Sequence, residues 1–179
     1  MKRDPNSLIA VIAVLLVGIL CQSSGAESPA LAYMSEEFSD IPFSTITLVT
    51  TIPSLMMIPA SLAYSAIRRK VSVRPLFIIA MFLLIGGGVY PAFSSTFAQV
   101  CMGRAVFGIG CGIMWPLAQS IIIELYNGTK QNTLLGFNSV ITSVGGIIWA
   151  NLGGVLALSG WRHSFLTYLV PVGVLVFCA

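Results

Sequence analysis

The 179-residue sequence is 56% hydrophobic and only 8% charged, with a mean hydropathy of +0.93. Soluble domains carry about a quarter charged residues, so this composition excludes an ordinary water-soluble domain. The formal net charge of +3 is small, and the basic residues are not interleaved with exposed aromatic residues, which argues against a nucleic-acid partner.

Six apolar segments separated by short polar stretches predict six transmembrane helices. A span needs about 20 residues, and the backbone in lipid must satisfy its own hydrogen bonds, so each segment is expected to be helical. The predicted fold class is an all-α integral membrane protein, a single six-helix domain over residues 1–179. The helices are expected at about 8–33, 43–66, 73–93, 97–126, 133–158 and 163–179.

The basic residues indicate the orientation of the chain. The side that would hold both termini carries seven of the nine Lys and Arg residues: Lys2, Arg3, Arg68, Arg69, Lys70, Arg74 and Lys130. The opposite loops carry Glu36, Glu37 and Asp40 with Arg162. Because positive charge collects on the cytoplasmic side, both termini are predicted to be cytoplasmic.

The first segment contains a charge where a membrane span is expected. Glu27 follows Ser23 and Ser24 by four and three residues, so these side chains share one helix face. A charge at membrane depth costs at least a few kcal/mol and usually faces a cavity or a partner. Glu27 is therefore a candidate functional residue, unless it lies at the headgroups.

The fourth segment carries a second charge, Arg104, followed at four-residue spacing by Gly108 and Gly112. The guanidinium and the two glycines share one face, which predicts that a neighbouring helix approaches closely and contacts the arginine. With Gly110, these glycines also resemble part of a dinucleotide-binding loop. The preceding strand, the full motif and the acidic residue are missing, so helix packing is the better interpretation and no cofactor is expected.

The fifth segment has a ladder of small residues, Gly146, Ala150 and Gly154, which also indicates close helix packing. Polar side chains inside the spans either line a substrate cavity or hydrogen-bond between helices, and the sequence leaves both open. They are Gln22, Gln119, Asn138 and Asn151, together with Trp115. The four cysteines lack metal or redox spacing, so no metal site is expected.

Three motifs make the sequence resemble the major facilitator superfamily over essentially its whole length. Arg104–Gly112 is close to the family's RxxqGxGxG motif, with Phe107 in place of the glutamine. The fifth segment resembles the motif GxxxxxxxxGxxxGPxxGG through Gly136, Gly145, Gly153 and Gly154, with Trp149 and Ala150 replacing Gly-Pro. Residues 60–69 resemble GxLaDRxGRR; they keep Arg68 and Arg69, but Tyr64 replaces the aspartate and Ser65 the first arginine.

Two shorter patterns agree with this resemblance: Gly160-Trp161-Arg162 before the sixth segment, and Pro29 followed by Phe38. The resemblance implies alternating-access transport of a small organic solute across the plasma membrane, with the motif arginine, Arg104, associated with proton coupling. Our leading hypothesis is that Glu27 and Arg104 both help to couple charge movement to the rocking of the two halves. The helix-five motif implies antiport. Members of the family have about twelve helices in two halves, so this chain is expected to be an amino-terminal half. It would need either the rest of a longer polypeptide or a second copy of itself.

Two other function classes are considered. A six-helix serine protease would need a serine and a histidine on facing helices, and His163 is the single histidine, beside Ser159 and Ser164; we therefore expect no enzyme. A non-transporting module would bind a partner or lipid through the basic residues 68–74. That module predicts no solute flux.

Overall fold

The structure is a computed structural model that describes residues 15, 18–19 and 22–169. Its regular elements are helices of α or 3-10 type. In chain order they are η1 (Gln22–Gly25), η2 (Ser28–Ala30), α2 (Leu31–Glu37), α3 (Phe43–Ile46), α4 (Leu48–Ile67), α5 (Val73–Val89), η3 (Tyr90–Phe93), α6 (Phe97–Leu125), α7 (Thr129–Ala157), α8 (Trp161–Phe165) and η4 (Leu166–Leu169).

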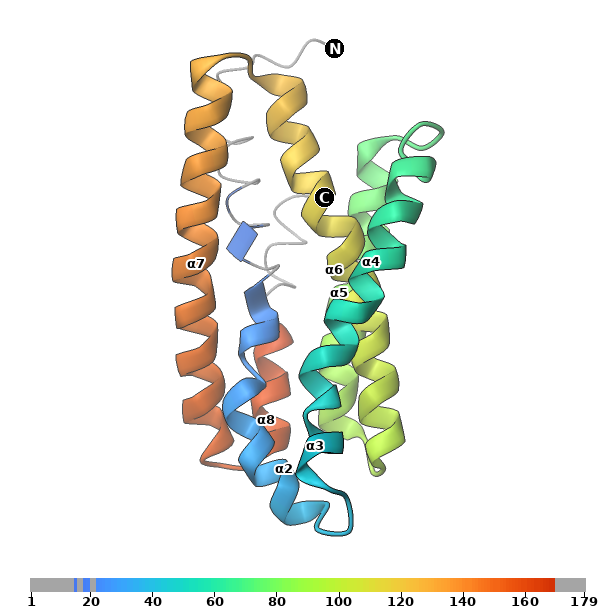
Figure 1. Cartoon of the computed structure of the whole chain (residues 1–179), viewed down its shortest axis with the longest axis vertical. Helices are drawn as coiled ribbons and strands as arrows, with labels where there is room; N and C mark the ends of the chain where they lie inside the picture. Colours follow the sequence, from blue (N-terminus) through green and yellow to red (C-terminus); the bar gives the residue numbers. More distant parts are fainter. Residues whose placement is uncertain (1–14, 16–17, 20–21, 170–179) are drawn as a thin grey trace.

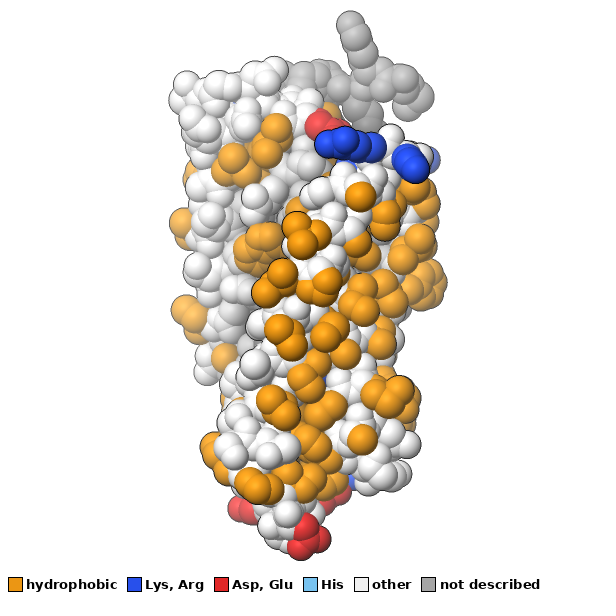
Figure 2. Space-filling model, turned by 45° about the vertical axis from the view of Figure 1, so that its right-hand side comes forward, with side chains coloured by type: hydrophobic (Ala, Val, Ile, Leu, Met, Phe, Trp, Pro, Cys, Tyr) orange, Lys and Arg blue, Asp and Glu red, His pale blue; other side chains and the backbone are white. Residues whose placement is uncertain are grey.

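The described part contains four helical segments that are long and apolar enough to cross a membrane: Phe43–Ile67, Val73–Phe93, Phe97–Leu125 and Thr129–Ala157. Their outward surface is strongly apolar, as the orange side chains in the middle of Figure 2 show, and the charged side chains lie at the two ends. This is the surface of a protein whose solvent is lipid, and the all-α membrane fold expected from the sequence is confirmed. Parts of the predicted first and sixth helices lie outside the described residues.

Two helices begin earlier than the apolar pattern indicated, and each begins after a glycine with positive φ. The fifth helix was expected from residue 133, but α7 begins at Thr129 after Gly128, whose φ is 62°. Similarly, α8 begins at Trp161 rather than at residue 163, after Gly160 with φ 125°. Polar residues in a first helical turn do not interrupt a helix, so hydropathy alone places such starts too late.

The start of α6 has a clear local cause. Thr96 precedes the helix in an extended conformation, and its side chain accepts a hydrogen bond from the backbone N–H of Gln99 at 3.4 Å. The Gln99 side chain in turn accepts one from the backbone N–H of Thr96 at 3.2 Å. This reciprocal capping box satisfies two donors that the first turn of a helix leaves unpaired.

α4 and α6 run parallel to each other, and α5 runs antiparallel between their ends (Figure 1). Glycines of α6 set the close approach. A Cβ at Gly108 would lie 2.5 Å from the carbonyl oxygen of Pro53, and one at Gly112 would lie 2.6 Å from the Cβ of Ala60. On another face of α6, a Cβ at Gly110 would lie 2.7 Å from the amide nitrogen of Leu84 in α5. The packing role expected for these glycines matches these contacts.

α7 lies on the opposite side of the bundle, against η1 and η2 (Figure 1). A Cβ at Gly145 would lie 3.2 Å from Cα of Ile19, and Gly153 faces the backbone of Ala26 so closely that no Cβ fits there. The Trp149 indole N–H donates to the carbonyl oxygen of Ile19 at 2.8 Å. The residue that replaces glycine in the family motif therefore bonds the first segment to α7.

Candidate functional site

The two charges that the sequence places inside membrane spans form a buried ion pair. A guanidinium nitrogen of Arg104 in α6 contacts a carboxylate oxygen of Glu27, which lies between η1 and η2. The Arg104 side chain is 0% exposed and that of Glu27 is 1% exposed. Each side chain is thus enclosed by other parts of the protein. The sequence marked each residue separately, but nothing in it showed that they meet.

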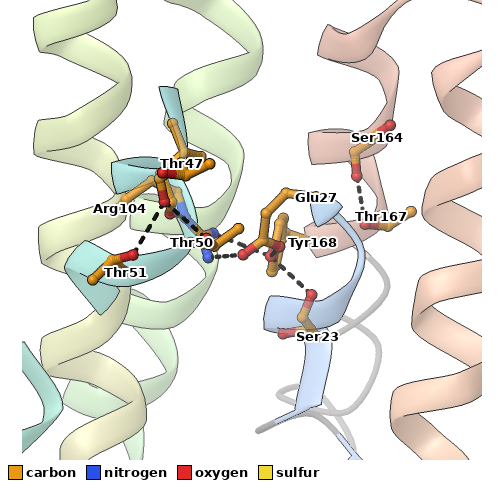
Figure 3. A network of polar contacts seen from close by, with 10 residues as sticks. Ser23, Glu27, Thr47, Thr50, Thr51, Arg104, Ser164, Thr167 and Tyr168 are labelled. Carbon is orange, nitrogen blue, oxygen red and sulfur yellow. Dashed lines mark hydrogen bonds and ion pairs between the residues drawn. The ribbon is translucent and has the colours of Figure 1, made fainter. Parts of the chain in front are cut away.

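The first segment positions Glu27 through an interruption of its helix. η1 and η2 are short 3-10 helices, and the bonds Ala26 N–H to Ser23 O (3.0 Å) and Ala30 N–H to Glu27 O (2.9 Å) span three residues instead of four. Pro29 lies in the first positions of η2, where its missing N–H is tolerated. Gly153 in α7 has no side chain, so the backbone of this irregular turn packs directly against it. The carboxylate is thereby directed toward α6 (Figure 3).

Arg104 keeps further hydrogen-bond partners besides Glu27. Its Nε–H donates to the carbonyl oxygen of Val49 in α4 at 3.1 Å, and an Nη1–H donates to the hydroxyl of Tyr168 in η4 at 3.1 Å. Arginine has five N–H donors in a fixed fork, and here they reach three different elements. The guanidinium thus links α4, the first segment and η4.

Tyr168 connects both members of the ion pair (Figure 3). Its hydroxyl oxygen lies 2.6 Å from a Glu27 carboxylate oxygen and 2.8 Å from the carbonyl oxygen of Ser23. A phenol has one proton, so at any moment it donates to one of these two acceptors while it accepts from Arg104. Sequence reasoning missed Tyr168, because a tyrosine in an apolar segment carries no signal of its own.

Aromatic rings surround the guanidinium where hydrogen bonds do not. The Arg104 Cζ atom lies 4.4 Å from the centroid of the Phe107 ring and 5.6 Å from that of Tyr168. The two rings meet edge to face with centroids 5.0 Å apart. Phe107 occupies the position at which the sequence departs from the family motif, and its ring face attracts the guanidinium cation.

The polar residues named as cavity candidates do not gather at this pair. Asn138 of α7 is buried beside Gly18, whereas Gln22, Trp115 and Gln119 are half-buried. Asn151 is exposed, and its amide donates to the carbonyl oxygen of Ile147 in its own helix. Asn151 therefore makes no hydrogen bond to a neighbouring helix within the described chain.

The remaining motif glycines differ in what they face. Gly146 and Gly154 each look toward the first segment, where an added Cβ would lie 3.7 Å from Nε2 of Gln22 and 3.6 Å from Pro29 respectively. An added Cβ at Gly136 would meet no described atom within 4 Å. Close packing thus accounts for Gly145 and Gly153, whereas the space beside Gly146 and Gly154 would admit a Cβ at ordinary contact distance and Gly136 is unexplained.

At one end of the bundle, the motif of residues 60–69, which forms the end of α4, pairs α4 with α6. Arg68 donates two hydrogen bonds to the Glu124 carboxylate, at 2.7 and 3.0 Å, and the Tyr64 hydroxyl is hydrogen-bonded to that of Ser120 at 2.8 Å. Tyr64 stands where the family has aspartate. In place of a carboxylate, the structure has a buried tyrosine whose hydroxyl has a hydrogen-bond partner.

At the other end, Glu37 of α2 joins α8. It accepts two hydrogen bonds from Arg162, at 2.8 and 2.7 Å, and one from the Trp161 indole N–H at 2.6 Å. The hydrogen bonds from Arg162 and then from Trp161 lower the pKa of the Glu37 carboxyl. Beside this cluster, His163 is exposed while the Ser164 hydroxyl is buried and donates to the Gly153 carbonyl oxygen at 2.8 Å. The two side chains of the protease hypothesis are directed to different surroundings.

Sequence comparison identifies the family of the chain. The model of the Major Facilitator Superfamily matches residues 13–179. Among curated proteins, a "Putative multidrug resistance protein MdtD" of Salmonella dublin is 26% identical over 179 residues, which cover 97% of this chain and 37% of that protein. A protein of the same name from Klebsiella pneumoniae strain 342 is 27% identical over 95% of this chain and 36% of its own length.

Solved structures show the same fold. A POT family transporter in complex with a thioalcohol-conjugated peptide superposes with a TM-score of 0.71 at 16% identity, over 92% of this chain and 36% of that chain. A variant of a peptide transporter POT in complex with sulfate superposes with a TM-score of 0.72 over 93% of this chain. The chain spans little more than a third of the length of the relatives it matches.

Proposed function

This chain belongs to the Major Facilitator Superfamily, and from that premise we propose that it forms one half of a proton-coupled secondary transporter. The transporter moves small organic solutes across the plasma membrane by alternating access, in which two halves rock about a central cavity. The curated relatives are named for multidrug resistance, which supports organic drugs as substrates and export as the direction. The imperfect helix-five motif supports proton antiport.

The observation that carries the proton-coupling proposal is the buried Glu27–Arg104 pair. A charged pair without access to water is costly unless both members are compensated, and the loss of one charge leaves the other buried and uncompensated. A proton that binds Glu27 removes the negative charge and weakens its hold on Arg104. Such a pair converts proton binding into a weaker contact between the first segment and α6.

A second six-helix half completes the proposed cavity. The relatives are almost three times as long as the matched region, which favours a second half supplied by a longer polypeptide over a second copy of this chain. In the proposed orientation, the end with Arg68 and Glu124 faces the cytoplasm, and so do both termini.

Proton-driven flux in proteoliposomes tests the proposal. The longest natural polypeptide that contains these residues is reconstituted, a pH gradient is imposed, and transport of the fluorescent cation ethidium is followed. The same assay is run on the 179-residue chain alone. We expect gradient-dependent flux in the longer protein, and loss of at least tenfold in Glu27→Gln and in Arg104→Ala. Glu36→Gln is the matched control, because it neutralises an exposed carboxyl at the end of the bundle.

Each outcome decides a part of the proposal. Flux that persists without a pH gradient would remove proton coupling, and flux that Glu27→Gln and Arg104→Ala leave intact would remove the pair from the mechanism. Flux from the short chain alone would mean that two copies assemble into the transporter. If ethidium and a panel of anionic and neutral drugs all give no flux, the partner- or lipid-binding module becomes the better hypothesis, and Arg69, Lys70 and Arg74, which are exposed, would be its binding surface.

A further inference from the structure

Pro53 lies in the second turn of α4, one turn after Val49, and this spacing has a consequence for the Val49 carbonyl group. In an α-helix, the carbonyl of a residue accepts a hydrogen bond from the N–H four residues later. The residue four positions after Val49 is Pro53, which has no N–H. The Val49 carbonyl oxygen is therefore left without its normal donor inside the helix.

The structure shows what uses this oxygen. The Nε–H of Arg104 donates to it at 3.1 Å, and both groups are buried. The approach is possible because Gly108, one turn after Arg104, has no side chain between α6 and Pro53. An unpaired buried carbonyl costs free energy comparable to a lost hydrogen bond, and so does an unpaired guanidinium N–H. The contact between Val49 and Arg104 satisfies both.

We propose that Pro53 is a positioning residue for the ion pair: it frees the Val49 carbonyl so that Arg104 has an acceptor that does not depend on the charge of Glu27. The inference rests on the proposed proton-coupled function and adds α4 to the proton site. When Glu27 takes up a proton and its hold on Arg104 weakens, the Val49 carbonyl, the Tyr168 hydroxyl and the Phe107 ring keep the guanidinium in place.

The surroundings contain few other groups that could take this role. Among the described residues, the charged or titratable groups that act on Glu27 are Arg104 of α6 and Tyr168 of η4, and Cys111 of α6 interacts electrostatically with the pair. α4 contributes the Val49 backbone to Arg104, and α7 contributes Gly153 to the turn that holds Glu27. Neither of these two is titratable, so the contribution of α4 to proton binding is a backbone acceptor.

The test restores the missing N–H. Pro53→Ala gives Val49 a donor inside α4, which competes with Arg104 for the carbonyl oxygen. The close contact of Gly108 is with the backbone of Pro53 and remains in the variant. The matched control is Pro59→Ala, which restores an N–H in the same helix at an exposed position that has no contact with Arg104.

The measurement is proton binding by Glu27 in the longest natural polypeptide containing this chain, reconstituted in lipid. Infrared difference spectra are recorded against pH, and the carboxylic acid band of Glu27 is identified by its loss in Glu27→Gln. The Val49 acceptor matters most when Glu27 is neutral, so its loss disfavours protonation. We expect the midpoint of the band in Pro53→Ala to move about one pH unit lower, which corresponds to about tenfold weaker proton binding. Pro59→Ala should leave the midpoint unchanged.

A second variant removes the donor of the hydrogen bond between Arg104 and Val49 instead of competing for its acceptor. Arg104→Lys keeps the positive charge but has no Nε–H, so it should lower the midpoint as well, and adding Pro53→Ala to it should then produce no further shift. A midpoint unmoved in Pro53→Ala, an equal shift in Pro59→Ala, or additive shifts in the double variant would each overturn the proposal. Because this titration needs no substrate, a transporter that shows no proton-driven flux would refute the proposed function without deciding the role of Pro53.

Discussion

At the scale of single residues, three of the positions where the chain departs from the family motifs form specific contacts. Phe107 places its ring against the Arg104 guanidinium, and Tyr64 is hydrogen-bonded to Ser120. Trp149 donates to the Ile19 carbonyl oxygen, across the contact between α7 and the first segment. These substitutions exchange small or polar motif residues for aromatic side chains with defined partners. The helices of these motifs therefore still pack together, but through aromatic side chains.

Tyr168 offers a test at this scale, because its hydroxyl is removable without loss of its ring. Tyr168→Phe keeps the edge-to-face contact with Phe107 but takes a hydrogen-bond partner from both Glu27 and Arg104. Bonds to charged groups are worth more than neutral ones, so we expect a loss of about 1.5 to 3 kcal/mol in the free energy of unfolding. Thermal unfolding in detergent measures the loss.

Tyr126→Phe is the control for that substitution. The Tyr126 hydroxyl is also buried but has no hydrogen-bond partner among the described residues. Its removal should leave stability unchanged or raise it. Equal destabilisation by the two substitutions would show that the Tyr168 hydroxyl contributes nothing beyond that of an ordinary buried tyrosine.

At the scale of elements, the register between α4 and α6 organises the domain. Arg104 and Gly108, four residues apart, meet Val49 and Pro53, which are also four apart. The same pairing continues to the far end, where Arg68 meets Glu124. Two parallel helices with matching spacing thus form one continuous contact, in which the buried charge lies near one end and an exposed ion pair closes the other.

Gly108 and Gly86 allow this contact to be tested with one substitution at two sites. A Cβ at Gly108 would lie 2.5 Å from the Pro53 carbonyl oxygen, so Gly108→Ala must push α4 away from α6. A Cβ at Gly86 in α5 would meet nothing within 4 Å. We expect Gly108→Ala to lower the thermal unfolding temperature clearly and Gly86→Ala to hold or raise it, because alanine is the better helix former by about 1 kcal/mol. Equal effects would contradict the packing described.

At the scale of the whole molecule, the charged side chains lie at the two ends of the bundle, and Lys and Arg side chains gather mainly at one of them (Figure 2). Exposed basic residues, including Arg69, Lys70 and Arg74, lie around the loop after α4, whereas Glu36 and Asp40 lie at the opposite end. We propose from this separation that the basic end faces the cytoplasm.

Labelling of cysteines introduced one at a time, in intact cells, measures the orientation. Asp40→Cys should react with a membrane-impermeant maleimide added outside, and Ser72→Cys should react only after the membrane is permeabilised. The parent protein, whose own cysteines lie in apolar segments, supplies the background. Reaction of Ser72→Cys from outside with protection of Asp40→Cys would reverse the topology.

Composition and pattern alone determined the membrane fold and the family, since a lipid environment requires long apolar helices and the motif glycines mark where helices approach. They also identified Glu27 and Arg104, because charges inside apolar segments are conspicuous. Only the tertiary structure decided that the two form one pair, that Tyr168 and the Val49 carbonyl complete it, and that Asn151 lies outside the interior. Contacts between residues 77 and 55 positions apart depend on how helices pack, and helix packing is a property of surfaces that hydropathy does not describe.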